Sequence, residues 1–133
     1  MKDYVNEIQV SLKIHDFECD ASHISDILGV QSTHIWKKGE PRGPGAIVFH
    51  ESNCWMHKIT KNDVIYVEEM IDTLVGIFEN KIENFKQLPK NCYMEIAIIC
   101  FFKRGMPSIT FNKKAIDFIH KIGAEIDFDM YGK

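Results

Sequence analysis

The sequence predicts an α+β fold in which a mixed or antiparallel sheet of about five strands packs with two long helices and one short helix. The first observation behind this prediction is Cys92–Phe102, where every residue except Glu95 is apolar or aromatic, as in a strand covered on both faces. The second is the alternation of apolar and polar residues near both ends of the chain, at Glu7–Ile14 and Glu125–Tyr131, which is typical of half-buried strands. The third is a stripe of apolar residues at helical spacing across residues 67–85.

Length and composition indicate a single α+β domain covering residues 1–133. The chain is 45% hydrophobic and 26% charged, which is ordinary for a globular protein. Its formal net charge is −3, so the sequence offers no broad attraction to nucleic acid or to an anionic membrane. We therefore expect neither nucleic acid nor a membrane as a partner.

The cysteines and the N-terminal residues favour a cytoplasmic protein. No Cys-x-x-Cys pair occurs, and Cys100 falls in the apolar run, where a free thiol acts as a small hydrophobic side chain. We expect every cysteine to be reduced, as in a cytoplasm. Residues 1–7 lack the apolar core of a signal peptide, and no run of about 18 apolar residues is present to cross a membrane.

The first predicted elements are a strand at Glu7–Ile14 and a short helix at Ala21–Leu28. In the strand, the apolar side chains point to one face and the polar side chains to the other. Asp20 is placed to cap the start of the helix, and Gly29 suits the left-handed conformation that ends a helix.

The next part of the chain, residues 30–53, is irregular because glycines and prolines interrupt it. A short strand is predicted within it at Ala46–Phe49, and a second short strand follows it at Cys54–Ile59.

The longest predicted helix begins after these strands, with Asn62 or Asp63 as its cap. Gly76 in its interior costs about 1 kcal/mol relative to alanine, so we expect the helix to bend or break before Pro89. Its inward stripe consists of Val67, Ile71, Leu74, Phe78, Ile82 and Phe85.

The run Cys92–Phe102 is predicted to be the central strand, with Ile96, Ile98 and Cys100 buried. Its other face is also largely apolar, so a helix, the long middle loop or a second copy of the chain must cover it. The apolar side chains of that face are Tyr93, Ala97, Ile99 and Phe101.

The C-terminal part is predicted to contain a short return strand at Ser108–Phe111 and a helix at Lys113–Ile122. Asn112 caps this helix and Gly123 ends it. The last strand places two rows of side chains on opposite faces. The inward row, expected to be buried, is Ile126, Phe128 and Met130, and the outward row is Glu125, Asp127 and Asp129.

Several segments of the chain match those of a known family. They are the strand Ser11–Ile14, the helix end Ile24–Gly29, the triplet Lys38–Glu40, the strand that carries Trp55, the long apolar-striped helix and the ending Ile122–Tyr131. In these segments, and over nearly its whole length, the chain resembles DUF4279, a bacterial domain family of unknown function. The resemblance implies a single α+β domain and a bacterial origin. The family brings no established catalytic residues, so the resemblance implies no activity.

The group His15, Cys19 and His23 has side chains suited to zinc, but not the spacing of a standard zinc site. In a second group, His50, Cys54 and His57, the pair His50-Glu51 does not continue into the His-Glu-x-x-His pattern of a zinc protease helix. On a strand, Cys54 and His57 face opposite sides, which argues against a catalytic Cys/His pair. We expect no metal and no other cofactor.

The loop region 36–57 supplies the candidates for a small-molecule site. Its glycines do not form a phosphate cradle, because Pro41 and Pro44 each remove a backbone donor. Trp36 has the side chain that protein interfaces favour, whereas Trp55 is more simply a packed side chain with its indole N–H paired. A pocket in this region would be lined by Trp36, Arg42, Trp55 and His57.

The outward row of the last strand, Glu125, Asp127 and Asp129, places carboxylates on one face at a spacing of about 7 Å. Such a row suits a basic partner or a hard cation. A solvated edge strand carries the same charges simply to avoid aggregation.

The sequence favours a non-enzymatic, cytoplasmic protein-interaction module, such as an immunity-type or accessory protein. No catalytic group satisfies the geometric arguments above, whereas the sheet has an uncovered apolar stripe and an acidic strand face. We expect the partner to be another protein, with a homodimer as a further alternative. The competing class is a small enzyme or small-molecule binder that uses the 36–57 loop region. A cleft lined by that region would favour the competing class, and a flat surface would favour the interaction module.

Overall fold

The structure is a computed structural model that describes residues 6–63, 66–103 and 105–132. Within these residues, alternating segments form the strands and apolar-striped segments form the helices, as the two periodicities require. In chain order, the elements are β1 (Asn6–His15), α1 (Ala21–Leu28), β2 (His34–Trp36), β3 (Cys54–Asn62), α2 (Glu68–Phe78), the 3-10 helix η1 (Glu79–Lys81), α3 (Ile82–Phe85), β4 (Tyr93–Phe102), α4 (Lys113–Ile122) and β5 (Glu125–Gly132).

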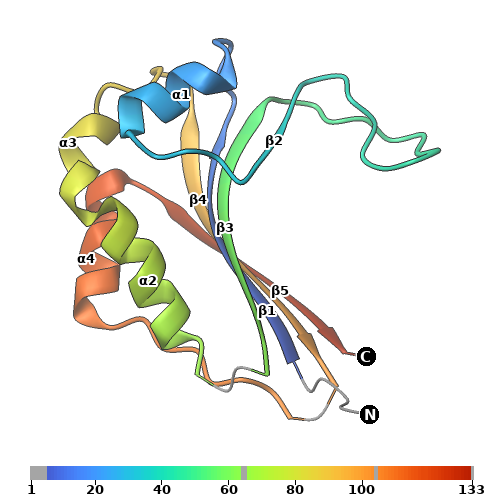
Figure 1. Cartoon of the computed structure of the whole chain (residues 1–133), viewed down its shortest axis with the longest axis vertical. Helices are drawn as coiled ribbons and strands as arrows, with labels where there is room; N and C mark the ends of the chain where they lie inside the picture. The colour runs from blue at the N-terminus through green and yellow to red at the C-terminus, as the bar shows by residue number, and fades with distance from the viewer. Residues whose placement is uncertain (1–5, 64–65, 104, 133) are drawn as a thin grey trace.

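The strands form one five-stranded sheet in the order β2-β3-β1-β4-β5 (Figure 1). Neighbouring strands are antiparallel, except that β4 and β5 are parallel and α4 connects them. The predicted α+β fold with a mixed sheet is therefore confirmed. The predicted centre of the sheet is wrong, because β1 is the middle strand and β4 lies between β1 and β5. Among the described residues, only β5 follows β4 in the chain, and it pairs on the side of β4 away from β1.

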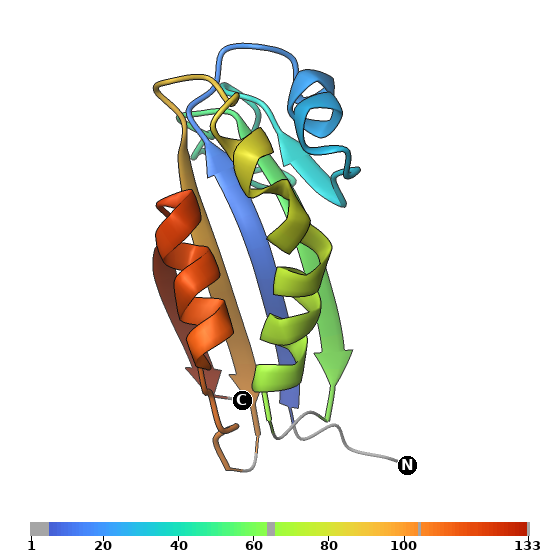
Figure 2. The same cartoon turned by 90° about the vertical axis from the view of Figure 1, so that its left-hand side faces the viewer.

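The helices α2, α3 and α4 lie against one face of the sheet, which they cover (Figures 1 and 2). Ile98 of β4 pairs with Val10 of β1, so both side chains point to this face. Ile96, Ile98 and Cys100 are buried there, as predicted. The helices contribute Met70, Ile71, Leu74, Phe78, Phe85, Phe118 and Ile119 to the same core.

The ends of α1 and α4 follow the local sequence signals. At the start of α1, Asp20 Oδ1 accepts a hydrogen bond of 3.5 Å from the backbone N–H of Ser22. At the start of α4, Asn112 Oδ1 accepts one of 2.9 Å from the backbone N–H of Ala115. Both helices end at a glycine in the left-handed conformation, with φ of 67° at Gly29 and 69° at Gly123. These predicted caps and stops are confirmed.

The long helix predicted after β3 is divided into α2, η1 and α3, so it breaks as expected. α2 begins at Glu68, and its N-cap residue Val67 makes no side-chain capping hydrogen bond, so the predicted cap at Asn62 or Asp63 is wrong. Asn62 is instead the last residue of β3, which extends further than its alternating pattern indicates. Phe78 and Phe85 meet edge to face across η1, with ring centroids 6.0 Å apart.

The two short strands predicted at Ala46–Phe49 and Ser108–Phe111 do not form. Each segment makes one isolated bridge, the first with Pro41 and the second with Tyr66. The structure instead contains β2, which pairs with β3 at the edge of the sheet. A strand of three residues is too short to show a period of two, so the sequence gives no signal for it.

The two rows of β5 point to the predicted faces, but the inward row is not buried. Register with β4 places Ile126, Phe128 and Met130 on the helix side. Their side chains remain 41, 45 and 37% exposed, so the expected burial is wrong. β5 is an edge strand, and each of these side chains therefore has a neighbouring strand on one side only.

Candidate functional site

The sheet face opposite the helices, which we call the open face, is not covered by any helix of the described residues (Figure 1). Lys13 pairs with Met56 on one side and with Glu95 on the other, so all three share this face. The open face also carries Trp36, His15, Tyr93, Ile99, Phe101 and Tyr131. This face therefore combines aromatic, apolar and charged side chains.

Residues 37–53, which we call the arm, leave the end of β2, project beyond the sheet and return to β3 (Figure 1). Backbone hydrogen bonds hold its two sides together. Gly39 N–H donates to His50 O at 2.9 Å, His50 N–H donates to Glu40 O at 2.8 Å, and Arg42 N–H donates to Val48 O at 3.0 Å. The arm is therefore a hydrogen-bonded structure in the chain alone.

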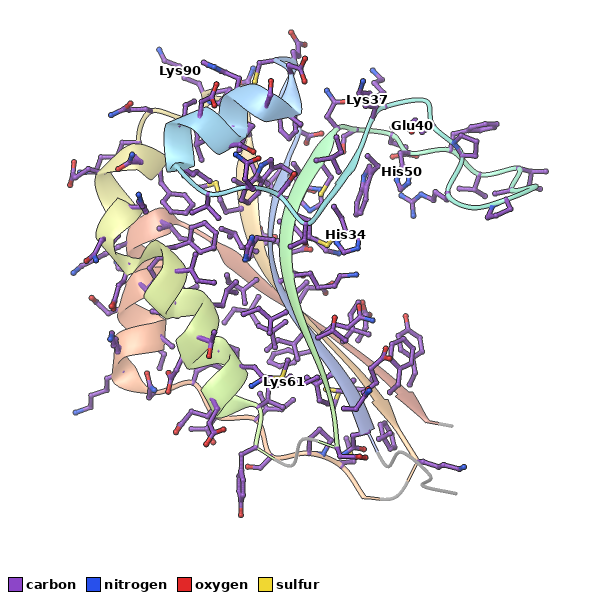
Figure 3. The ribbon with its side chains drawn as sticks, in the orientation of Figure 1. His34, Lys37, Glu40, His50, Lys61 and Lys90 are labelled. Atoms are coloured by element: carbon purple, nitrogen blue, oxygen red, sulfur yellow. The ribbon has the colours of Figure 1, made fainter. Side chains whose placement is uncertain are left out.

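The base of the arm is anchored on the open face. The Trp36 and His50 rings stack with centroids 4.6 Å apart, and Lys13 Nζ lies 5.8 Å from the Trp36 ring centroid. Asn53 joins the arm to the rest of the fold, since its Oδ1 accepts from Lys38 N–H at 2.8 Å and its Nδ2 donates to Phe17 O at 2.7 Å. Figure 3 shows His50 and Glu40 in the arm near this base.

The tip of the arm exposes consecutive apolar side chains. Ile47, Val48 and Phe49 are 91, 56 and 51% exposed. Single exposed apolar residues are common on protein surfaces, whereas contiguous exposed apolar groups are less so. These residues were predicted as part of a strand, and the sequence signal that could have indicated their exposure is an apolar triplet that follows Gly43-Pro44-Gly45 and Ala46 in a loop.

A polar group lies next to the arm, at the His15 end of β1. His15 stacks on Tyr93 with ring centroids 4.7 Å apart, and its Nε2 lies 3.7 Å from Glu95 Oε1. That nitrogen makes no hydrogen bond with any residue that the structure describes. Burial lowers the pKa of His15, and this effect outweighs the attraction of the Glu95 carboxylate. His15 is therefore held largely neutral near pH 7.

Cys54 is buried on the open face, paired with Trp36 of β2 and with His15 of β1. Burial is the main cause that raises the pKa of its thiol to about 12. A thiol with this pKa carries almost no thiolate at neutral pH, so Cys54 is not an activated nucleophile. His57 points to the opposite face of β3, as predicted, and cannot act on Cys54.

This environment leads to a test with a thiol-alkylating reagent. We expect Cys54 and Cys100 to resist iodoacetamide at pH 7.5 in the folded chain, because both are buried and burial raises both pKa values. Half-buried Cys19 should be modified first. Peptide mass spectrometry of the folded and the denatured chain would show the order, and rapid labelling of Cys54 in the folded chain would contradict this account.

Three adjoining hollows surround the loop between β1 and α1, and all of them include Glu18. Their volumes are about 280, 390 and 230 Å³. Asp16 in this loop has a left-handed φ of 64°, which is uncommon for a residue other than glycine. The other charged side chains around the hollows are Asp20, Lys37, Lys38, Glu51 and Lys90; Lys37 and Lys90 are labelled in Figure 3. Ligand pockets are usually lined predominantly by hydrophobic and aromatic side chains with a few polar groups, whereas several charged side chains surround these hollows.

The structure does not bring the residues predicted for a small-molecule site together. Trp36 lines one hollow from the open face. Trp55 and His57 share the helix side of β3, where Trp55 is fully buried and His57 Nδ1 lies 2.9 Å from Gln31 O. Arg42 is exposed in the arm. Because Trp36 and Trp55 lie on opposite faces of the sheet, these four residues do not form one pocket.

The acidic row, Glu125, Asp127 and Asp129, lies on the open side of β5, as predicted. Tyr131 follows it on the same side and stacks on Phe101 with ring centroids 5.2 Å apart. In the described parts of the chain, no three His, Cys, Asp or Glu side chains gather in an arrangement suited to a metal ion. The row is therefore a charged strip rather than a closed cluster.

None of the helices in residues 6–63, 66–103 and 105–132 is both long and apolar enough to cross a membrane. No curated protein and no solved structure matches the chain significantly. The family described as "Domain of unknown function (DUF4279)" matches residues 6–133, which include every element of the sheet and all the helices described above. The chain therefore belongs to the DUF4279 family.

Proposed function

We propose that this chain is a non-enzymatic, cytoplasmic protein-interaction module of the immunity or accessory type, which binds another protein with its open side. The observation that carries the proposal is the apolar tip of the arm, where Ile47, Val48 and Phe49 are held away from the chain's own core. The hydrophobic effect disfavours such exposure at roughly 25 cal/mol per Å² of apolar surface, and a bound partner would remove that cost.

The order of the arm supports the same proposal. Its cross-arm hydrogen bonds and the Trp36–His50 stack fix the backbone, so binding would not require the arm to fold first. A segment fixed in its binding shape loses less conformational entropy on association than a flexible loop. The acidic row on the same side would guide a basic partner into place, since complementary charge raises the association rate.

A second candidate function is small-molecule binding in the 36–57 region, which would also admit a small enzyme. The three hollows around Glu18 favour it, because Trp36, Lys37 and Asn53 line one of them. Against it stand the several charged side chains around the hollows and the suppressed nucleophilicity of Cys54. The first candidate accounts for the exposed arm, and the second does not.

The arm can be tested by photo-crosslinking in cells. A photoreactive amino acid at position 47 should crosslink the chain to one other protein, which mass spectrometry then identifies. The product of the adjoining gene is the first candidate to examine. Met106, an apolar residue that is 63% exposed outside the arm, is the control position. The identified partner is then purified and titrated against the parent chain.

The variant for this titration replaces Ile47 and Phe49 with serine. We expect about a hundredfold weaker binding, because two apolar anchors are lost from one contact, and an unchanged melting temperature. Met106→Ser should bind like the parent chain. Equal crosslinking from positions 47 and 106, or equal binding by the arm variant, would remove the arm as the docking site and leave the proposal without its main support.

A further inference from the structure

The outer edge of β5 is an unusual feature of this sheet. β5 pairs with β4 in continuous parallel register from Glu125 to Gly132. Among the described residues, no strand pairs with its other side. Natural edge strands are commonly protected by charged side chains, especially lysine, or by proline, a bulge or short length. Of these protections β5 has only charge, in the acidic row; its eight residues include no proline, no lysine and no break in register.

The two faces of β5 carry different side chains, and the difference determines which strand could pair with its outer edge. On the helix side, Ile126, Phe128 and Met130 are half-exposed, and the Phe128 ring meets the Phe111 ring edge to face with ring centroids 6.0 Å apart. On the open side, the acidic row is followed by the stacked aromatic pair Phe101–Tyr131. An added strand would therefore need apolar side chains on one face and positive charges on the other.

Charge argues against a second copy of β5 in this place. In an antiparallel pair of β5 strands, the acidic rows of the two copies would lie opposite one another on the same face, and like charges in cross-strand pairs are destabilising. No Lys or Arg occurs in residues 125–132 to relieve this repulsion. The acidic row thus disfavours self-pairing and favours a basic strand.

We propose that the β5 edge binds an extended segment of the partner protein as an additional strand, with apolar residues alternating with Lys or Arg. This inference rests on the proposed interaction function and names the partner segment. The backbone groups of β5 give the added strand its hydrogen bonds, as in other cases of strand addition. The inward row, Ile126, Phe128 and Met130, packs beside the apolar side chains of the added strand. The acidic row pairs with the Lys or Arg side chains of that strand. The Phe101–Tyr131 stack offers an aromatic surface to the last cation.

The probe is a blocked eight-residue peptide of alternating lysine and valine, labelled for fluorescence anisotropy and titrated with the full chain. We expect saturable binding that weakens as salt is raised, because the contact is partly electrostatic. Asp127→Lys combined with Asp129→Lys should weaken binding about tenfold or more. The matched control is Glu83→Lys combined with Asp117→Lys, which reverses two exposed charges on the helices and should bind like the parent.

Hydrogen exchange of β5 distinguishes strand addition from mere adsorption of a cation. Along a strand, the N–H groups point alternately to its two sides, so every second amide of β5 already bonds to β4. On peptide binding, only the alternate, outward amides should gain protection. A scrambled peptide in which the lysines are consecutive has the same charge and should not produce this alternation.

Several outcomes would overturn the inference. They are equal binding by the charge-reversed and control variants, absence of peptide binding, or an unchanged exchange pattern in β5. Concentration-dependent protection of the outward amides in the chain alone would assign this edge to a second copy instead. None of these results affects the crosslinking test of the arm, so the interaction function would stand or fall separately.

Discussion

Replacing Ile98 with aspartate is expected to abolish cooperative folding of the chain. Ile98 is fully buried in β4, between Val10 of β1 and Phe128 of β5 on the helix side of the sheet. A carboxylate there would have no cationic partner, so it would remain charged at a large cost or take up a proton with a strongly raised pKa. Either cost is comparable to the whole stability of a small domain, which is about 5–15 kcal/mol.

Far-ultraviolet circular dichroism during thermal unfolding is the measurement, and Ile99→Asp is the matched control. Ile99 is the next residue of the same strand, but it points to the open face and is half-buried. The control should keep a cooperative transition at a reduced melting temperature, since its carboxylate can reach water. A cooperative melt of Ile98→Asp near that of the parent chain would show that the side-chain assignment of β4 is inverted.

The elements with local signals were predictable from the sequence. Asp20 and Gly29 bound α1, and Asn112 and Gly123 bound α4, because caps and left-handed stops depend on neighbouring residues only. The strand order was not predictable in the same way. That β1 is central depends on pairing with β3 and β4, which are distant in the chain.

The candidate site was predictable in part. The period of two correctly placed the acidic row on one face of β5 and placed Trp55 and His57 on one face of β3. It could not show which face of β3 the helices cover, so Trp55 was grouped with Trp36 in a pocket that does not form. The arm was missed because its shape depends on Trp36 stacking on His50 and on Asn53 bonding to distant backbone.

Trp55 is the second residue at which a large effect is expected, and this effect concerns stability rather than binding. Its side chain is fully buried, and its Nε1–H donates a hydrogen bond of 2.9 Å to Ser25 Oγ. Its ring meets the Phe78 ring edge to face, with ring centroids 6.3 Å apart. We expect Trp55→Ala to lower the free energy of unfolding by about 3–5 kcal/mol, as for other large aromatic truncations in cores. Urea unfolding followed by circular dichroism gives this value.

A double-mutant cycle separates the hydrogen bond from the packing. Trp55→Phe leaves Ser25 Oγ without its donor, and Ser25→Ala leaves the indole N–H unpaired inside the core. The double variant should lose less stability than the sum of the single variants, by about 1 kcal/mol, because the two groups are then removed together. Simple additivity would show that the Trp55–Ser25 contact contributes nothing.

The same variants show whether Trp55 belongs to the binding surface. Trp55→Phe should bind the lysine–valine peptide and the crosslinked partner with unchanged affinity, at a temperature where the variant is fully folded. The indole lies on the helix side of β3, whereas the arm and the acidic row lie on the open side. A loss of binding by folded Trp55→Phe would mean that the partner reaches the helix side of the sheet. The open face would then not be the surface on which this chain acts.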